Sequence, residues 1–280
     1  MVDSRWIPLE SNPEVFNGWA EKAGLVTSQM CFHEVYGFDD ELLEMIPQPV
    51  KAVILLFPLD EATRRKHEAE DDEIEKKGQP LLDDTLMWIK QRIGNACGTM
   101  ALIHALANSD VTIVPNSALA QFIESCKGKT PLERAEALET TPLFAKIHKE
   151  LASTGQSAIP EDLNTELHFS AFVAAPEAPA RTAARAAQVS VNVPPPVGGS
   201  GARSVAEASG AAGETKAGGE TKRGTKMRLV ELDGTRRGPV DRGECGELLQ
   251  DAVQVIRSKY MTETNSIYFS LLALAPPHLD

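Results

Sequence analysis

The sequence predicts a globular chain built from both helices and strands, and three observations support this fold class. An early segment repeats apolar residues at helical spacing, and residues 50–57 form an apolar run rich in β-branched side chains. Hydrophobic residues make up 42% of the 280 residues and charged residues 24%. This ordinary globular balance excludes a wholly disordered or fibrous chain.

The first predicted helix begins at Pro13, with Asn12 in the N-cap position, and ends at Gly24. Residues 50–57 are bounded by prolines and predict a buried strand. The apolar face of the helix repeats at i, i+4 and i+8 with Val15, Trp19 and Ala23.

Residues 60–77 are highly charged and predict an exposed loop or helix. The acidic run Glu68–Glu75 at its centre is interpreted as a solvated face rather than a docking site. The other predicted elements are helices over 99–107, 131–138, 143–151 and 246–257, and strands over 166–173, 227–232 and 267–275.

Composition changes sharply between Val173 and Lys226. Of these 54 residues, 27 are Ala, Gly or Pro and none is aromatic. Such a segment cannot bury enough apolar surface to offset the entropy of ordering it. We therefore expect a disordered insertion, residues 173–226, within a single domain that spans residues 1–280. The insertion carries a charge of +3. Since the whole chain carries −12, the remaining 226 residues carry −15.

Charge and cysteine usage restrict the function classes. The net charge of −12 argues against a general nucleic-acid binder, which needs a basic surface, and favours a basic partner. The longest apolar run, Ala52–Pro58, is too short to span a bilayer, and the N-terminal residues do not resemble a secretion signal. The four cysteines form no CxxC pair and no zinc spacing. They predict reduced thiols in a cytoplasmic protein, with a nuclear location left open.

The most informative segment is QRIGNACG at residues 91–98, which precedes an apolar helix. Cys97 would lie at the N-terminus of that helix, where free N–H groups and the positive end of the dipole favour a thiolate. The Gln91 side-chain amide and the Cys97 backbone N–H can supply two donors to an oxyanion. A buried structural cysteine after a glycine turn fits the same segment, and the local pattern does not separate the two interpretations.

A nucleophilic cysteine needs a base and a group that orients the base. Alternation in LHFSAFV places His168 on the strand face opposite Phe169 and Ala171. Taken singly, His168 fits a hydrogen-bonded histidine better than a base. Asp233 ends the strand LVELD, although Asp-Gly is also a common turn dipeptide. Together, the order Gln, Cys, His, Asp along the chain favours the catalytic interpretation of these residues.

The sequence resembles the ubiquitin carboxyl-terminal hydrolases (peptidase family C12), a papain-like class of cysteine deubiquitinases, and in particular the small stand-alone members. The resemblance covers nearly the whole chain outside the insertion. The Gln-x5-Cys spacing within GNACG and the ELDG motif after the histidine strand are its specific features. The matching segments are RWIPLESNPEVFN (5–17), FHEVYGFDDELLEMIP (32–47), KAVILLFP (51–58), QRIGNACGTMALIHALAN (91–108), LHFSAFV (167–173), VELDGTRRGPVDRGE (230–244) and SIYFSLLALAP (266–276).

The resemblance implies an α+β, papain-like fold in which helices flank a central, mainly antiparallel sheet in α/β/α layers, with a knotted backbone. It implies that Cys97 is the nucleophile and His168 the general base and acid. It further implies that Asp233 orients the imidazole and that Gln91 donates to the oxyanion. No metal or organic cofactor is implied.

The resemblance also implies a substrate. The reaction expected is hydrolysis of the bond after the C-terminal glycine of ubiquitin, with release of small adducts, short peptides or unfolded tails. Pro8, Leu9 and Glu10 match the segment that contacts ubiquitin in the family, and residues 152–165 match its active-site crossover loop. We expect a monomer that binds neither nucleic acid nor membrane. A hydrolase of a ubiquitin-like modifier and a non-catalytic ubiquitin-binding module remain alternatives.

Overall fold

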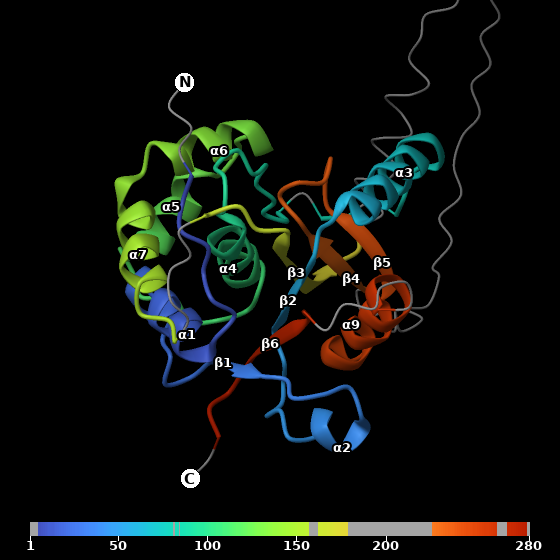
Figure 1. Ribbon diagram of the computed structural model, residues 1–280, viewed down its shortest axis with the longest axis horizontal. Helices are drawn as coiled ribbons and strands as arrows, with labels where there is room; N and C mark the ends of the chain where they lie inside the picture. The colour runs from blue at the N-terminus through green and yellow to red at the C-terminus, as the bar shows by residue number, and fades with distance from the viewer. Residues whose placement is uncertain are drawn as a thin grey trace, which may run out of the picture. The chain divides into compact units, whose positions relative to one another are not determined.

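A six-stranded sheet with helices on both faces forms the described part of the chain (Figure 1). The computed structural model describes residues 5–80, 82–83, 85–156, 162–178, 226–261 and 268–278. The strand order is β1-β6-β2-β3-β4-β5, and every neighbouring pair is antiparallel. The strands are β1 Cys31–Glu34, β2 Ala52–Pro58, β3 Leu167–Pro176, β4 Met227–Leu232, β5 Val240–Glu244 and β6 Ser270–Ala275.

Helices lie on both faces of the sheet (Figure 1). On one face, α1 (Pro13–Ala23) and α4 (Cys97–Ala107) pack against the sheet. The same hydrophobic core continues outward to α5 (Ala118–Ser125), α6 (Pro131–Glu139) and α7 (Pro142–Ala152). The other face packs against α2 (Asp40–Leu43), α9 (Leu248–Ile256) and a π-helical turn (Arg257–Met261), and α3 (Glu61–Lys77) lies beside β5. Within the described ranges, no helix is both long and apolar enough to cross a bilayer.

Strand β2 shows why the sheet has two hydrophobic cores. Ala52 and Ile54 belong to the core under α4, whereas Val53, Leu55 and Phe57 belong to the core under α9. Successive side chains of a strand point to opposite faces, so a strand covered on both sides has to be apolar throughout. The layered α/β/α arrangement implied by the resemblance is therefore confirmed.

Helix α1 forms where its capping residues predict it. The side chain of Asn12 accepts a hydrogen bond from the N–H of Glu14 at 2.8 Å, and Pro13 occupies the first turn. The helix ends at Gly24, whose φ of 121° is a conformation that favours glycine. The other predicted helices and strands are also confirmed, with boundaries that differ by at most three residues.

Five short elements are absent from the sequence prediction: β1, α2, α5, β5 and the π-helical turn Arg257–Met261. None has more than eight residues, so apolar periodicity has too little length to become visible in them. The two strands lie at the edges of the sheet, where pairing with β6 and with β4 stabilises them. Tertiary pairing outweighs local pattern at these positions.

The expected insertion begins later than Val173. Strand β3 continues to Pro176, opposite Met227 of β4, and the Glu177 N–H donates to the Lys226 carbonyl at 2.9 Å. The predicted start was therefore wrong, because the neighbouring strands supply hydrogen-bond partners for this Ala-rich stretch. The remainder of the insertion, 179–225, lies outside the described residues, so its disorder stays a prediction, as does the knot.

The acidic run Glu68–Glu75 is not a wholly solvated face. Asp71 is only 8% exposed, and its Oδ1 accepts from Arg236 Nε at 2.8 Å. Glu70 accepts two hydrogen bonds from Arg242 at 2.6 and 3.0 Å. The expectation was wrong at these two positions because both arginines come from segments near the other end of the chain. Their charges make burial of the carboxylates possible.

Candidate active site

Cys97, His168 and Asp233 meet where one helix and two strands come together. Cys97 is the first residue of α4, His168 the second residue of β3, and Asp233 directly follows β4. His168 Nε2–H donates to Asp233 Oδ1 at 2.8 Å, and the same ring shares a hydrogen bond with Cys97. Since Nε2 is bound to the carboxylate, the thiol is left with Nδ1. All three side chains are buried.

His168 and Asp233 each favour the ionised form of the other. Burial by itself lowers the pKa of His168, but the charge of Asp233 and its hydrogen bond raise that pKa to about 10. Burial also opposes ionisation of Asp233. The His168 charge, together with hydrogen bonds from the Thr235 N–H and hydroxyl at 2.7 Å each, nevertheless holds the Asp233 pKa well below its usual range. An ionised carboxylate therefore holds an imidazole that can take a proton from the thiol.

The backbone of Gln91 is bound to the residue that follows Asp233. Its N–H donates to the carbonyl of Gly234 at 2.9 Å, and its side-chain Nε2 donates to the carbonyl of Ile93 at 3.2 Å. Nε2 carries two hydrogens, so one remains for another acceptor. The N–H of Cys97 has no acceptor inside α4 because it lies in the first turn. These two donors are suited to an oxyanion.

A second cysteine–histidine contact has the opposite electrostatics. Cys31 Sγ lies 3.2 Å from His33 Nε2, but burial raises the pKa of this thiol and lowers the pKa of this imidazole. Both changes disfavour a thiolate–imidazolium pair. Only Cys97, of the four cysteines, contacts a histidine that is bound to a carboxylate in the described residues. Burial likewise raises the thiol pKa of Cys126, and that of Cys245 to about 11.

Comparison with known sequences identifies the family. The profile described as "Ubiquitin carboxyl-terminal hydrolase, family 1" matches residues 6–178. Ubiquitin carboxyl-terminal hydrolase 3 of Arabidopsis thaliana is 31% identical over 275 residues, which cover 97% of this chain and 94% of the relative. A ubiquitin carboxyl-terminal hydrolase of Drosophila melanogaster is 32% identical over 271 residues, or 96% of each chain.

The chain belongs to the ubiquitin carboxyl-terminal hydrolase family 1. A solved structure of the catalytic domain of Trichinella spiralis UCH37, bound to ubiquitin vinyl methyl ester, has the same fold. It aligns with a TM-score of 0.60 at 18% identity and covers 98% of this chain and 96% of that chain. The longer Trichinella spiralis UCH37 chain aligns at 0.57, covering 96% and 81%.

In this hydrolase-family chain, residues 88–91, which precede the nucleophile, donate hydrogen bonds to the backbone carbonyl groups of the turn 233–236. The Trp88 indole donates to the carbonyl of Asp233 at 3.0 Å, and the Gln91 N–H donates to the next carbonyl. The Lys90 ammonium group donates to the last two carbonyls, each at 2.8 Å. All four carbonyls of the turn are thus bound by one short segment. Sequence reasoning missed Trp88 and Lys90, although both lie close to Gln91.

His104 connects the same two parts of the chain from inside the core. Its Nε2 accepts from the N–H of Ile89 at 3.0 Å, and its Nδ1 lies 3.3 Å from the carbonyl of Leu232. Burial lowers its pKa to about 4, so the ring is neutral, with Nδ1–H as the donor. His104 therefore has a structural position, joining the end of β4 to the segment before Cys97.

The N-terminal residues of interest differ in exposure. Leu9 is buried, and a Cβ added at Gly98 would lie only 3.0 Å from its Cδ1. Leu9 therefore packs on the first turn of α4, beside the nucleophile. Pro8 and Glu10 are half-buried, and Glu10 Oε1 accepts from Asn12 Nδ2 at 3.2 Å. Contact of these three residues with ubiquitin stays a prediction.

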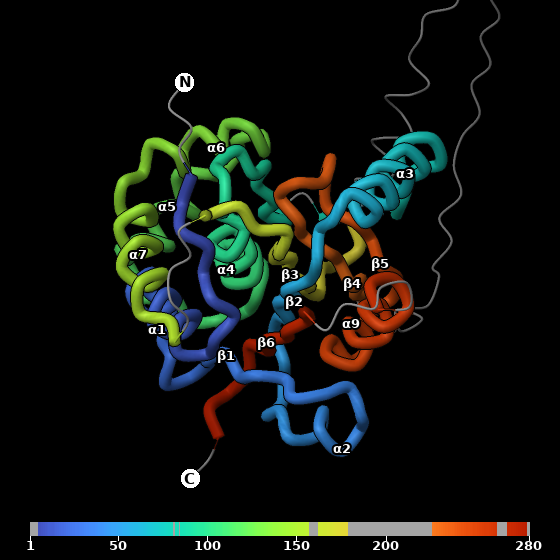
Figure 2. The backbone as a smooth tube through the Cα atoms, viewed as in Figure 1, coloured from blue at the N-terminus to red at the C-terminus, as the bar shows by residue number. Residues whose placement is uncertain are grey.

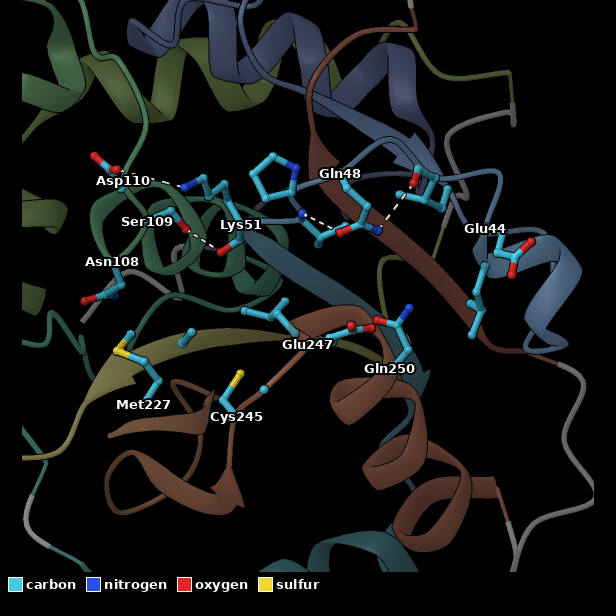
Figure 3. A pocket seen from close by; sticks show the side chains of 17 residues that line it. Glu44, Gln48, Lys51, Asn108, Ser109, Asp110, Met227, Cys245, Glu247 and Gln250 are labelled. Atoms are coloured by element: carbon cyan, nitrogen blue, oxygen red, sulfur yellow. Dashed lines mark hydrogen bonds and ion pairs between the residues drawn. The ribbon is translucent and has the colours of Figure 1, made fainter. Parts of the chain in front are cut away.

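A separate cavity of about 640 Å³ lies between the start of β2, the end of α4 and the start of α9 (Figure 3). Lys51 lies 3.9 Å from Asp110, and the Ser109 hydroxyl donates to the Lys51 carbonyl at 2.9 Å. Gln48 bonds to the backbone of its own neighbours. The lining includes none of the four candidate catalytic side chains. The polar groups of Gln48, Lys51 and Ser109 are bound to the chain itself, and we assign no site to this cavity.

Proposed function

We propose that this chain is a cysteine-dependent deubiquitinase that hydrolyses the bond after the C-terminal glycine of ubiquitin. The observation that carries the proposal is the hydrogen-bonded series from Cys97 through His168 to Asp233 in a chain of this family. A non-catalytic binding module would not require a buried carboxylate behind the imidazole. The Arabidopsis and Drosophila relatives are named ubiquitin carboxyl-terminal hydrolases, and the similar UCH37 structures hold a ubiquitin derivative.

The first half of the reaction forms an acyl-enzyme. His168 Nδ1 takes the proton of the Cys97 thiol, and the sulfur forms a bond to the carbonyl carbon of the last glycine of ubiquitin. The carbonyl oxygen becomes an oxyanion, which accepts from the Cys97 N–H and the Gln91 amide. His168 then gives its proton to the leaving amine, the C–N bond breaks, and a thioester remains.

The second half releases ubiquitin. Water attacks the thioester carbonyl while His168 takes a proton from the water molecule. The C–S bond breaks, and the Cys97 sulfur recovers its proton from His168. Asp233 stays ionised throughout because its pKa lies far below its usual range, and it keeps the imidazole oriented through Nε2–H.

The size of the leaving group follows from the length of the proposed crossover loop, residues 152–165, of which 157–161 lie outside the described residues. Fourteen residues have a contour of about 50 Å, so the loop can enclose an opening of about 15 Å at most. A helix about 10–12 Å across can pass such an opening, whereas a folded protein about 30 Å across cannot. We therefore propose small adducts, short peptides and unfolded tails as leaving groups. Equal rates on diubiquitin and on a ubiquitin–peptide fusion would contradict this limit.

The decisive experiment is reaction of the chain with ubiquitin that bears a C-terminal electrophile. Mass spectrometry should find one adduct on Cys97, and the Cys97→Ala variant should form none while it still binds ubiquitin. Binding without an adduct in the unsubstituted chain would favour a non-catalytic module. A faster reaction with the same electrophile on a ubiquitin-like modifier would assign the substrate to that modifier instead.

A further inference from the structure

Asn95 joins three segments of the chain beside the nucleophile. Its side-chain Nδ2 donates to the carbonyl of Trp6 and to the carbonyl of Leu163, each at 2.9 Å. Asn95 lies two residues before Cys97, and Leu163 lies five residues before His168. One amide group therefore binds the N-terminal segment and the segment that leads into β3 to the turn that carries the cysteine.

The backbone and a second side-chain pair support the same junction. The N–H of Trp6 donates to the carbonyl of Gly94 at 2.9 Å, and Arg5 forms a parallel bridge with Gly94. The guanidinium of Arg5 donates to the side chain of Asn164. Figure 2 shows the N-terminal segment and the segment before β3 passing alongside α4. Residues 5–6, 94–95 and 163–164 thus form one hydrogen-bonded cluster, which we call the Asn95 clamp.

Asparagine is suited to this position for two separate reasons. Its φ of 60° lies in the left-handed region, which asparagine and glycine adopt more readily than other residues. Its carboxamide offers two N–H donors to two carbonyl acceptors. Aspartate would place acceptors against those carbonyls, and glycine would keep the backbone but lose both hydrogen bonds. Glycine is therefore the substitution that removes the two side-chain hydrogen bonds of the clamp without backbone strain.

We infer that Asn95 is a positioning residue, and that the Asn95 clamp fixes the two chain segments that flank Cys97 so that a polypeptide C-terminus can be seated at the sulfur. Cys97 is only 7% exposed, so a polypeptide carbonyl must approach it between the segments around it. The reaction of Cys97 with a small alkylating reagent does not depend on how these two segments are positioned. The inference rests on the proposed function for the identity of the polypeptide, which is the C-terminal tail of ubiquitin.

The test compares two glycine variants and two reagents. Asn95→Gly removes the hydrogen bonds from Asn95 to Trp6 and Leu163, and Asn116→Gly is the matched control, because Asn116 is exposed and has the same φ of 60° in the turn before α5. We measure the rate at which Cys97 reacts with iodoacetamide and with ubiquitin vinyl methyl ester. Asn95→Gly should slow the ubiquitin reagent by about 10- to 100-fold and change the iodoacetamide rate by less than about twofold. Asn116→Gly should change neither rate.

Hydrogen exchange gives a measurement that does not depend on the substrate. Amides of residues 162–166 should exchange faster in Asn95→Gly than in the unsubstituted chain and in Asn116→Gly. Unchanged exchange would contradict the inference. An equal loss of rate with both reagents would also contradict it, because the substitution would then act on the nucleophile or on the fold. If the unsubstituted chain reacts with iodoacetamide but not with the ubiquitin reagent, the proposed function fails, and the exchange measurement still decides the clamp.

Discussion

The carbonyl of Gly234 accepts a hydrogen bond from the backbone N–H of Gln91 at 2.9 Å. The residue after the carboxylate that holds His168 is therefore bound directly to the proposed oxyanion donor. The approach is close because Gly234 has no side chain, and a Cβ there would lie 2.8 Å from the Cβ of Gln91 and 3.0 Å from its nitrogen. This contact sets the spacing between two halves of the site, the segment that carries Gln91 and Cys97 and the turn that carries Asp233.

A methyl group at Gly234 should push these halves apart. Gly234→Ala places Cβ against backbone atoms of Gln91 and Ile89, so we expect a loss of about 1–3 kcal/mol in the free energy of unfolding and a lower kcat. Gly238→Ala is the control, because a Cβ there would meet nothing within 4 Å. It should change stability by less than about 0.5 kcal/mol. Urea denaturation measures the free energy of unfolding, and single-turnover acylation measures the rate. If the two variants lose stability and rate equally, the close contact at Gly234 is not the cause.

Replacing the carboxylate behind the imidazole should change the pKa of His168. Asp233→Asn removes the charge that raises this pKa, so the value should fall from about 10, as followed by NMR titration of the ring. We expect kcat/KM to fall by about 10²- to 10⁴-fold because the imidazole loses its orienting partner. Asp72→Asn, at an exposed carboxylate of α3, should leave both quantities unchanged. A His168 pKa that does not move would rule out Asp233 as its main partner.

The raised pKa of His168 also predicts how stability depends on pH. Folding increases proton affinity, so the contribution of His168 is complete below its unfolded pKa of 6.5 and is lost as the pH rises towards 10. The stability difference between the unsubstituted chain and His168→Gln should therefore shrink across this interval, by up to about 1.4 kcal/mol per pH unit. Urea denaturation at several pH values measures it. A difference that grows with pH would contradict the stated direction.

Two neighbouring arginines should differ sharply in their importance for stability. The side chain of Arg236 is 1% exposed and binds Asp71 and Glu70, whereas that of Arg237 is 53% exposed. Arg236→Met leaves the Asp71 carboxylate without its buried cation and should cost about 3–5 kcal/mol of unfolding free energy. Arg237→Met should change the unfolding midpoint little. If Asp71→Leu combined with Arg236→Met recovers none of the loss, the buried pair is not its cause.

The ends of β3 and β4 allow a direct test of the expected insertion. Pro176 lies opposite Met227, and the N–H of Glu177 donates to the carbonyl of Lys226, so the two strand ends are already adjacent. Replacing residues 178–225 with an Asn-Gly turn should keep most of the hydrolase activity and of the unfolding free energy. Turnover of a ubiquitin amide and urea denaturation measure the outcome. Loss of either would show that residues 178–225 contribute to the folded domain.

The sequence by itself determined the main elements of the fold. The cap at Asn12, the apolar run of β2 and the glycine turn before Cys97 act over a few residues, so their local pattern is sufficient to predict them. For Cys97, His168 and Asp233 the local pattern was ambiguous, and the family resemblance implied their roles. The structure then brought the side chains of His168 and Asp233 to the cysteine.

Only the tertiary structure decided how those residues are held. Lys90 binds carbonyl groups 145 and 146 residues further along the chain, and Asn95 binds partners 89 residues before it and 68 after it. Such bonds join side chains to backbone carbonyls of distant segments, so they have no period and leave no local pattern. Asp71 lies in an acidic run that predicts solvent exposure, because burying an isolated charge is costly. Its burial becomes favourable only when the fold brings Arg236 to it.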